Sequence, residues 1–348
     1  MHFDGVALQN FRNYSQKSFL FPKQTTIIVG KNAAGKTSIL EAIALLSTGN
    51  SFRAEEVEEM IRFTEEISRV KSKITHNDEV TEQEVLLTRG LFNGKSVQSR
   101  LYSVNDVRRR KKDFAGNFFT VVFRPEDMRL VEGSPSRRRH FIDTILTVTD
   151  PEYAQSLKEY EQGLVRRNRI LSQVQEGTMP RTVLSFWNAL LLKHGQILQE
   201  KRREFFSTFS SVNFPMEFFI EYQPSIINEE RMQQYAEKEI IVGHTLIGPH
   251  KDDFTVLYHD HQISLFGSRG QQRLAVLWLK MCELSYVTNQ TTTQPILLLD
   301  DIFSELDDEH RDQVVKLMQD RQTIMTTTEE KSIAAIQLHI QDIDVIYV

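Results

Sequence analysis

The stretch from Thr25 to Leu46 limits the possible folds more than any other part of the sequence. Four residues, Thr26 to Val29, predict a short buried β-strand, because all four are β-branched and a glycine follows them. The next segment, GKNAAGKT, fits the phosphate-binding pattern GxxxxGK(S/T), and apolar residues recur at helical spacing beyond it. A strand, a glycine loop and a helix in this order predict a nucleotide-binding α/β fold.

The predicted loop offers several donors to phosphate oxygens. Its glycines let backbone N–H groups turn inward, and the helix N-terminus adds partial positive charge. Lys36 would place its charge on the β- and γ-phosphates, and the hydroxyl of Thr37 would hold Mg²⁺. We therefore predict a nucleotide site made of Gly30, Lys31, Asn32, Ala33, Ala34, Gly35, Lys36, Thr37 and Ser38.

A second apolar strand, PILLLDD, ends in two carboxylates, Asp300 and Asp301. A Mg²⁺–nucleotide site needs one acid for the metal and its water shell, and one acid to orient the attacking water. We assign the metal to Asp300 and the water to Asp301. The alternative is a strand that merely ends in an acid capping the next helix.

The segment FGSRGQQR allows two interpretations. Ser268 and Gln271 have the spacing of a capping box at the start of an apolar helix, which is a local role. A serine, Gly270 and a glutamine at a helix N-terminus also form an anion site, which could receive the γ-phosphate bound by a second subunit. In SELD, Ser304 and Asp307 leave the same choice between a helix cap and a contact across subunits.

The remainder of the chain predicts an antiparallel β region over 67–103 and two long helices between 150 and 209. These helices form either a two-helix arm or an ordinary packed pair. The last hundred residues alternate between helix and strand, which predicts completion of a parallel sheet.

Composition excludes several classes of protein. No window reaches the roughly 20 apolar residues of a membrane span, and Asp4 falls where a signal peptide needs an apolar run, so we expect a cytoplasmic protein with no membrane partner. Cys282, the single cysteine, excludes an internal disulfide framework. The net charge of −5 does not indicate nucleic-acid binding, so DNA contacts would depend on local arginine clusters: Arg108 to Arg110, Arg137 to Arg139, Arg166, Arg167 and Arg169. Surface salt bridges are the alternative role for each cluster.

The order GKNAAGKT, SRGQQR, LLLDD, SELD resembles the ABC-type ATPase heads of the SMC and RecF families. In those heads the serine-glycine-glutamine element is the signature motif and SELD is the D-loop. NFRNY, FRPEDMRLVEGSPSRRRHFID and GPHKDD also resemble landmarks of the RecF family of bacterial recombination mediators, along the whole chain. The short helical insert favours RecF over SMC proteins, whose arms are far longer.

The resemblance implies an α/β P-loop NTPase fold. It would comprise an ABC-type ATPase head, with a mixed β-sheet, flanking helices and an antiparallel β subdomain, plus a short α-helical arm domain. The expected division is 1–149 for the N-terminal part of the head, 150–240 for the arm and 241–348 for the C-terminal part of the head.

The resemblance also implies roles for individual residues. ATP and Mg²⁺ would be the cofactors, with Lys36 and Thr37 in the loop and Asp300 as the Walker B acid. Signature residues Ser268, Gly270 and Gln271 would contact the other subunit's γ-phosphate, and Arg12 and Asn13 sit where related heads contact the base and sugar side of the nucleotide. Catalysis would rest on Asp301, Asp300 and Lys36.

Two departures from the general ABC pattern favour slow hydrolysis. Asp301 replaces the usual glutamate, and Thr326 to Thr328 stand where a switch histidine would be. Both features are RecF-like. No residue is identified as the Q-loop glutamine.

The implied function is that of an ATP-dependent homodimer that closes as a clamp on double-stranded or gapped DNA, with weak, DNA-stimulated ATPase activity. The resemblance further implies help in loading RecA at single-strand gaps, with RecR and RecO as partners. One rival is a metabolic P-loop kinase, which would not need Ser268. Another is the nucleotide-binding subunit of a transporter, whose signature usually carries two glycines where this chain has Arg269-Gly270.

Overall fold

The structure, a computed structural model, describes residues 1–92, 95–305, 308–328, 333 and 336–348. The chain forms two compact units. Unit 1 contains Met1–Asp127 and Val287–Val348, and unit 2 contains Met128–Tyr286. The division expected from the sequence, at 149 and 240, is a different partition and stays a prediction. Among the described residues, no helix is both long and apolar enough to cross a bilayer.

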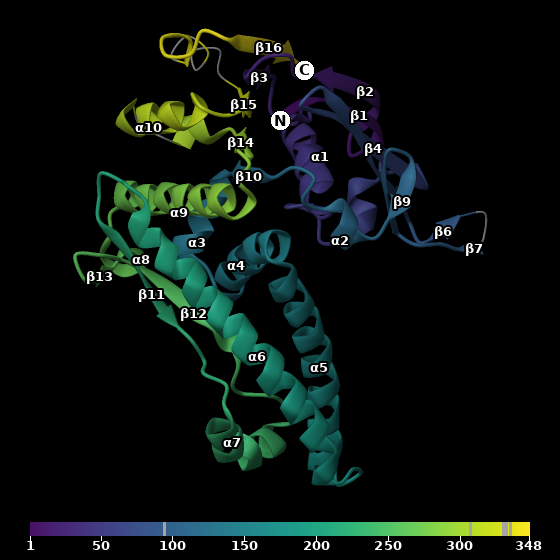
Figure 1. The fold of residues 1–348 in the computed structure, drawn as a ribbon, viewed down its shortest axis with the longest axis vertical. Helices are drawn as coiled ribbons and strands as arrows, with labels where there is room; N and C mark the ends of the chain where they lie inside the picture. Colours follow the sequence, from purple (N-terminus) through teal and green to yellow (C-terminus); the bar gives the residue numbers. More distant parts are fainter. Residues whose placement is uncertain (93–94, 306–307, 329–332, 334–335) are drawn as a thin grey trace. The chain divides into compact units, whose positions relative to one another are not determined.

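Unit 1 contains a parallel sheet of five strands in the order β10-β14-β15-β3-β16 (Figure 1). All four strand pairs are parallel. Three of the strands are buried at every position, as expected when both faces of a parallel sheet are covered. The strands are β3 (Thr25–Val29), β10 (Thr120–Phe123), β14 (Ile296–Asp300), β15 (Thr323–Thr327) and β16 (Ile343–Tyr347). The predicted parallel sheet is confirmed.

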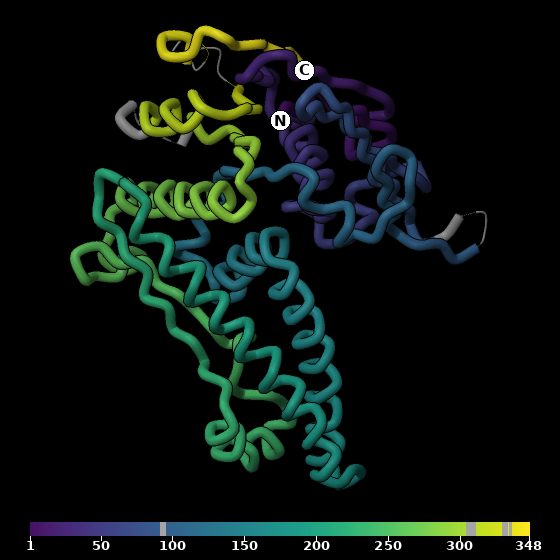
Figure 2. The backbone as a smooth tube through the Cα atoms, in the orientation of Figure 1, coloured from purple at the N-terminus to yellow at the C-terminus, as the bar shows by residue number. Residues whose placement is uncertain are grey.

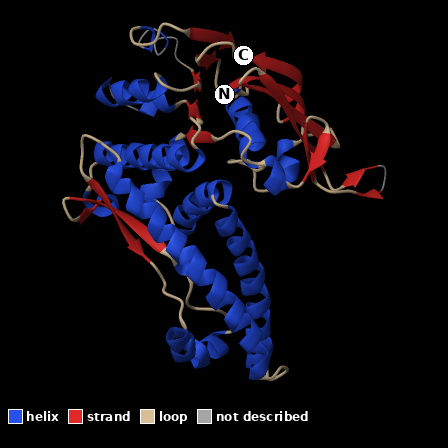
Figure 3. Ribbon diagram, in the orientation of Figure 1, coloured by secondary structure: helices blue, strands red, loops and turns tan. Residues whose placement is uncertain are grey.

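Unit 1 also contains a second, antiparallel sheet, whose strands are red in Figure 3. Its strand order is β2-β1-β4-β5-β8-β9. Buried and more exposed positions alternate along β4, which is the pattern of a sheet with one face on the core. Its strands are β1 (His2–Phe11), β2 (Tyr14–Leu20), β4 (Ile67–His76), β5 (Glu79–Thr88), β8 (Arg100–Val104) and β9 (Val107–Arg109). The expected antiparallel subdomain is confirmed. Strand β6 (Leu91–Phe92) pairs with β7 (Lys95–Ser96) in a short antiparallel ribbon. The sequence places a hairpin signal at Asn93-Gly94, and these two residues lie outside the described residues.

Helix α1 (Lys36–Thr48) packs against strands of both sheets. Its side chains share one core with Phe3 and Val70 of the antiparallel sheet and with Leu298 and Ile324 of the parallel sheet. Because α1 is covered on several sides, its apolar residues extend around the helix rather than along one stripe. The helix that carries the nucleotide loop is thus the centre of the core of unit 1.

Short helices and one longer helix complete unit 1. They are η1 (Val57–Met60), α2 (Lys111–Phe114), η6 (Ile302–Glu305) and α10 (Asp308–Met318), and η2 (Pro125–Met128) lies at the boundary. Both chain termini, marked N and C in Figure 2, belong to this unit. Strand β16, near the C-terminus, pairs with β3.

Unit 2 is mainly helical. The predicted pair of long helices is confirmed as α5 (Pro151–Gln175) and α6 (Leu184–Ser207), which pack side by side and antiparallel (Figure 1). Their approach is close at Gly163, where an added Cβ would lie 2.5 Å from Leu190 Cδ2. The other elements are α3 (Arg129–Glu132), α4 (Pro135–Thr149), η3 (Arg181–Val183), η4 (Thr208–Ser211), β11 (Phe218–Gln223), α7 (Glu229–Val242), η5 (Pro249–Lys251), β12 (Asp253–Tyr258), β13 (His261–Gln262) and α8 (Ile263–Phe266). Helix α9 (Arg269–Thr291) begins in unit 2 and ends in unit 1.

The GPHKDD segment holds a buried charge network in unit 2. The carboxylate of Asp252 is fully buried and accepts hydrogen bonds from Arg202 (2.8 Å), Gln199 (2.9 Å) and Tyr222 (2.5 Å). Arg202 also forms an ion pair with Asp143 at 2.8 Å. The segment forms an internal network in which each of these charges has an opposite partner, as buried charges require.

Candidate nucleotide-binding site

The phosphate-binding loop follows β3 and has backbone conformations that glycine favours. Gly35 has φ of 107°, and Ala33 has φ of 66°. A Cβ added at Gly35 would lie 2.5 Å from the Asn13 side-chain nitrogen, and one added at Gly30 would lie 2.6 Å from the carbonyl oxygen of Val348. Two of the predicted loop glycines are therefore required by close packing as well as by the motif.

Lys36 is held against the loop that precedes it. Its Nζ donates to the carbonyl oxygens of Gly30 at 2.7 Å and Lys31 at 3.0 Å, and the residue is buried. A phosphate oxygen is a charged acceptor and can replace either carbonyl. The ammonium group of Lys36 is therefore already in position to donate to a phosphate oxygen.

The hydroxyl of Thr37 lies 2.9 Å from both carboxylate oxygens of Asp300. Thr37 follows β3 and Asp300 ends β14, and β15 lies between these two strands. The carboxyl ends of parallel strands meet at one edge of the sheet, where such folds bind ligands. The structure thus brings the two predicted metal ligands together.

Thr326, at the same edge on β15, connects the two acids. Its hydroxyl donates to Asp300 Oδ1 at 2.8 Å and accepts the backbone N–H of Asp301 at 3.0 Å. In the sequence, Thr326 is only one residue of the segment that stands where a switch histidine would be. The available signal was a polar residue near the end of a neighbouring parallel strand, where its side chain can meet those of β14.

The oxygen atoms of Thr37 and Asp300 fit Mg²⁺, which prefers oxygen ligands and is usually held by one or two carboxylates with phosphates and water. Burial raises the pKa of Asp300, while hydrogen bonds from Thr326 and Thr37 oppose that rise. The charge of Glu126 raises this pKa further and that of Arg124 lowers it. A bound cation would favour the ionised carboxylate. The described residues contain no group of three or more His, Cys, Asp or Glu side chains that could hold a metal ion.

Asp301 has a left-handed backbone conformation, with φ of 50°. This conformation is uncommon for a non-glycine residue, and such strain clusters at functional sites. Its N–H also lies 3.2 Å from the carbonyl oxygen of Thr326. The carbonyl and the hydroxyl oxygen of Thr326 on β15 therefore both hold the Asp301 N–H in place. The catalytic role of Asp301 stays a prediction.

Arg12 and Asn13 contact different parts of the site. Asn13 reaches the loop, because its side-chain nitrogen donates to the carbonyl oxygen of Ala34 at 3.1 Å. Arg12 forms a two-point ion pair with the fully buried Glu41 of α1, at 2.6 and 2.8 Å. Arg12 therefore anchors α1, and the predicted contact of both residues with the base and sugar stays a prediction.

The signature residues lie at the start of α9 in unit 2. Ser268 Oγ accepts the N–H of Gln271 at 3.3 Å, and Gln271 Oε1 accepts the N–H of Ser268 at 2.8 Å. This reciprocal pair confirms the capping box. Ser268 and Gly270 are exposed, and the second role at a partner's γ-phosphate stays a prediction. In the SELD segment, Asp307 and the side chain of Ser304 lie outside the described residues.

The arginine clusters divide into paired residues, exposed residues and Arg139, which is half-buried and donates to the carbonyl oxygen of Asp252 at 2.9 Å. Arg167 is buried and pairs with Glu239 at 2.7 Å, and Arg138 pairs with Asp253 at 2.6 and 2.8 Å. For Arg138 the salt-bridge alternative is correct. For Arg167 the expectations of a DNA contact and of a surface salt bridge are both wrong, because its side chain and its ion pair are internal. The exposed members are Arg108, Arg109, Arg110, Arg137, Arg166 and Arg169.

Comparison with known proteins agrees with the motifs and the fold. Residues 2–341 match the RecF/RecN/SMC N-terminal domain family. The DNA replication and repair protein RecF of Bacillus cytotoxicus is 32% identical over 94% of this chain and 92% of its own. Two solved structures of the recombination mediator RecF in the RecFOR pathway, one with ATP and one described as RecF-ATPrS, are each 28% identical over 94% of this chain, covering 92% and 93% of theirs, with TM-scores of 0.84 and 0.85. The chain therefore belongs to the RecF family and has the ABC-type ATPase head fold of the RecF and SMC proteins.

Proposed function

We propose that the protein binds ATP and Mg²⁺ and closes on DNA as an ATP-dependent homodimer in replication and recombinational repair. The observation that carries the proposal is the meeting of Thr37 and Asp300, which joins the phosphate loop to the Walker B acid at one edge of the sheet. The names of the relatives, which include DNA replication and repair and recombination mediation, support the cellular role.

In this proposal each nucleotide site has two halves. The loop, Lys36, Thr37 and Asp300 bind the phosphates and metal from one subunit. The exposed N-terminus of α9, with Ser268 and Gly270, approaches the γ-phosphate from the other subunit. A two-fold symmetric dimer makes both contacts twice with the same surfaces.

Hydrolysis would release the dimer. Asp301 orients the attacking water, and Lys36 neutralises charge on the transferred phosphoryl group. Mg²⁺, when bound, offsets charge on the β- and γ-phosphate oxygens. The aspartate side chain is one methylene shorter than the glutamate that is usual in ABC-type heads, which favours slow turnover.

The exposed arginines supply DNA phosphate contacts, which give affinity without reading sequence. Gapped DNA would be the substrate, RecR and RecO the partners, and RecA loading the outcome. The relatives' assignment to the RecFOR pathway supports this part of the proposal.

The test is the mass of the protein in solution, measured by light scattering with and without Mg²⁺ and ATP, then with duplex DNA added. We expect a monomer that doubles only with Mg²⁺ and ATP, and at lower protein concentration on DNA. A mass that ATP and DNA leave unchanged would overturn the clamp and leave an ATP-binding head that acts without a second subunit.

A further inference from the structure

A basic pocket lies at the far end of α1 from the nucleotide loop. Helix α1 begins at Lys36 and ends at Thr48, with Gly49 as its C-terminal cap. Thirteen residues at about 1.5 Å each make a helix of roughly 20 Å. The pocket adjoins the cap, because the Tyr102 hydroxyl donates to the carbonyl oxygen of Gly49 at 3.1 Å. It shares no lining residue with the phosphate loop.

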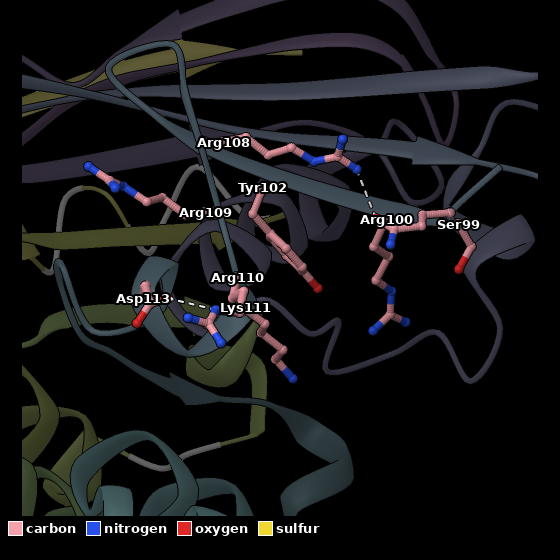
Figure 4. Close-up of a pocket in the computed structure, with 9 residues that line it drawn as sticks. Ser99, Arg100, Tyr102, Arg108, Arg109, Arg110, Lys111 and Asp113 are labelled. Atoms are coloured by element: carbon pink, nitrogen blue, oxygen red, sulfur yellow. Dashed lines mark hydrogen bonds and ion pairs between the residues drawn. The ribbon is translucent and has the colours of Figure 1, made fainter.

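The pocket has a volume of about 920 Å³ and is lined from β8, β9 and the start of α2 (Figure 4). Five cationic side chains and one carboxylate line it, so its charge is strongly positive in a chain that is acidic overall. The lining residues are Gln98, Ser99, Arg100, Tyr102, Arg108, Arg109, Arg110, Lys111 and Asp113.

Most of this positive charge has no anionic partner among the described residues. Arg100 and Arg108 bond to neutral side chains, Asn50 at 3.1 Å and Gln98 at 2.8 Å. Within the described part of the chain, only Arg110 of this set approaches a carboxylate, that of Asp113 at 3.6 Å in an exposed pair. The buried Arg167 and Arg202 of unit 2 are, by contrast, matched by carboxylates.

Lys111 is the recessed member of the set. Its side chain packs on the helix cap, since a Cβ added at Gly49 would lie 3.0 Å from Lys111 Cε. Burial, together with the charge of Arg100, lowers the pKa of Lys111 to about 8. An ammonium group that is desolvated next to another cation is stabilised by any anion that enters the pocket.

Capping of α1 accounts for part of this arrangement. Cations near a helix C-terminus interact favourably with its dipole, which explains a cation close to Gly49. It does not explain the arginines of β9, which come from an edge strand and extend the same positive surface. Guanidinium groups present forked donors that match phosphate oxygens, and a lysine adds a compact charge.

We propose that this pocket is a second anion site that receives phosphate groups of a nucleic-acid strand. The inference rests on the proposed DNA binding and deepens it, by naming Arg100, Arg109 and Lys111 as the residues that bind those phosphates. Free polyphosphate carries the same chemistry, so the test separates the two sources.

The test uses the full chain, with Lys111→Gln compared with Lys112→Gln. Lys112 is an exposed neighbour on α2 that does not line the pocket, and both variants remove one positive charge. Duplex DNA binding is measured over a range of salt concentrations. The slope of log affinity against log salt should fall in magnitude by about 0.9 for each DNA phosphate that Lys111→Gln no longer neutralises. Lys112→Gln should keep the wild-type slope, and both variants should keep wild-type ATP affinity.

Tripolyphosphate titration in a Lys36→Ala background, where the nucleotide loop is disabled, reports free-phosphate binding. Loss of DNA affinity in Lys111→Gln alone supports the nucleic-acid site. If Lys111→Gln weakens tripolyphosphate binding but not DNA binding, the nucleic-acid site is overturned in favour of a free polyphosphate ligand. If the wild type binds DNA and both glutamine variants match it, the pocket inference fails while the proposed function stands. If the wild type binds no DNA, both fail.

Discussion

Thr37 and Asp300, far apart in the sequence, are joined by a hydrogen bond in which the threonine hydroxyl lies 2.9 Å from each carboxylate oxygen. The parallel sheet places them at one edge although their strands are not neighbours. The fold therefore assembles the two protein ligands of the proposed Mg²⁺ site from the chain alone.

The variant Asp300→Asn should lose stabilisation by Mg²⁺ and ATP. For wild type, a ligand at a hundred times its Kd raises the free energy of unfolding by about 2.7 kcal/mol. The variant should keep only the stabilisation that wild type shows with ATP when a chelator removes Mg²⁺. Without ligand it should be at least as stable as wild type, because a buried carboxylate with a raised pKa is replaced by a neutral amide. Thermal melts with and without Mg²⁺ test this, and a full Mg²⁺-dependent shift in the variant would contradict the assignment.

Thr326 should matter through its hydroxyl. Thr326→Val removes the hydroxyl that donates to Asp300 and accepts the Asp301 N–H. Thr37 still reaches Asp300 and the Thr326 carbonyl oxygen still accepts the Asp301 N–H, so the expected cost is that of a lost hydrogen bond, about 0.5–1.5 kcal/mol. It should also raise the pKa of Asp300 further, because the Thr326 hydrogen bond lowers it. We expect slower ATP turnover at neutral pH with little change in ATP affinity. Thr326→Ser keeps the hydroxyl and should restore turnover, and equal defects in both variants would refute the hydrogen-bond role.

Substitutions at Arg167 and Arg169 should have different effects, the first on stability and the second on DNA binding. Arg167→Ala leaves Glu239 buried without its partner, which destabilises by about 3–5 kcal/mol. Arg169→Ala changes an exposed residue and should alter unfolding by less than about 0.5 kcal/mol. Urea denaturation measures the loss of stability, and DNA titration of both folded variants measures their DNA affinity, which should fall only in Arg169→Ala. Weaker DNA binding with unchanged stability in Arg167→Ala would show that the internal ion pair is not its role.

The local part of the site was predictable because it depends on neighbouring residues. The strand before Gly30, the loop and the helix follow from β-branching, glycines and helical spacing, and all three are present in the structure. The capping box at Ser268 was also predictable, since its hydrogen bonds join residues three apart.

Long-range partners were not predictable from the same patterns. Nothing in the spacing of the arginine cluster distinguishes Arg167, which meets Glu239 from another helix, from the exposed Arg166. The pairing of Arg12 with Glu41 and the bridge made by Thr326 also depend on which elements lie side by side. The packing partners of α1, β15 and α7 decide these contacts, and the sequence specifies them only through the complete fold.

Lys111 should make stability depend on pH. Its pKa is lowered from 10.5 to about 8, so between these values the unfolded chain holds a proton that the folded protein does not. The free energy of unfolding therefore rises with pH across this window. Below pH 8 the burial penalty is complete, and Lys111→Met should be more stable than wild type by at most roughly 3 kcal/mol.

The charged and titratable groups around Lys111 are Arg100 and Tyr102 on β8, and Arg110 and Asp113 beside it. Burial raises the pKa of the Tyr102 phenol, and the charge of Arg100 acts in the opposite direction. Urea denaturation at pH 7 and pH 10 gives the difference between wild type and Lys111→Met. That difference should shrink at pH 10, and a constant difference would show that Lys111 does not titrate there.

Ser268 should act beyond its capping role. Ser268→Ala and Ser268→Arg both remove the hydroxyl that accepts from Gln271, so each should lose about 1 kcal/mol of stability at the start of α9. Only arginine adds a long side chain at the exposed surface proposed to meet the partner's γ-phosphate. Ser268→Arg should therefore bind ATP with normal affinity yet stay monomeric, whereas Ser268→Ala should dimerise at higher protein concentration. Light scattering with Mg²⁺ and ATP measures both variants against wild type. If arginine and alanine shift dimerisation equally, the serine is a helix cap alone, and the second half of the nucleotide site must be sought elsewhere.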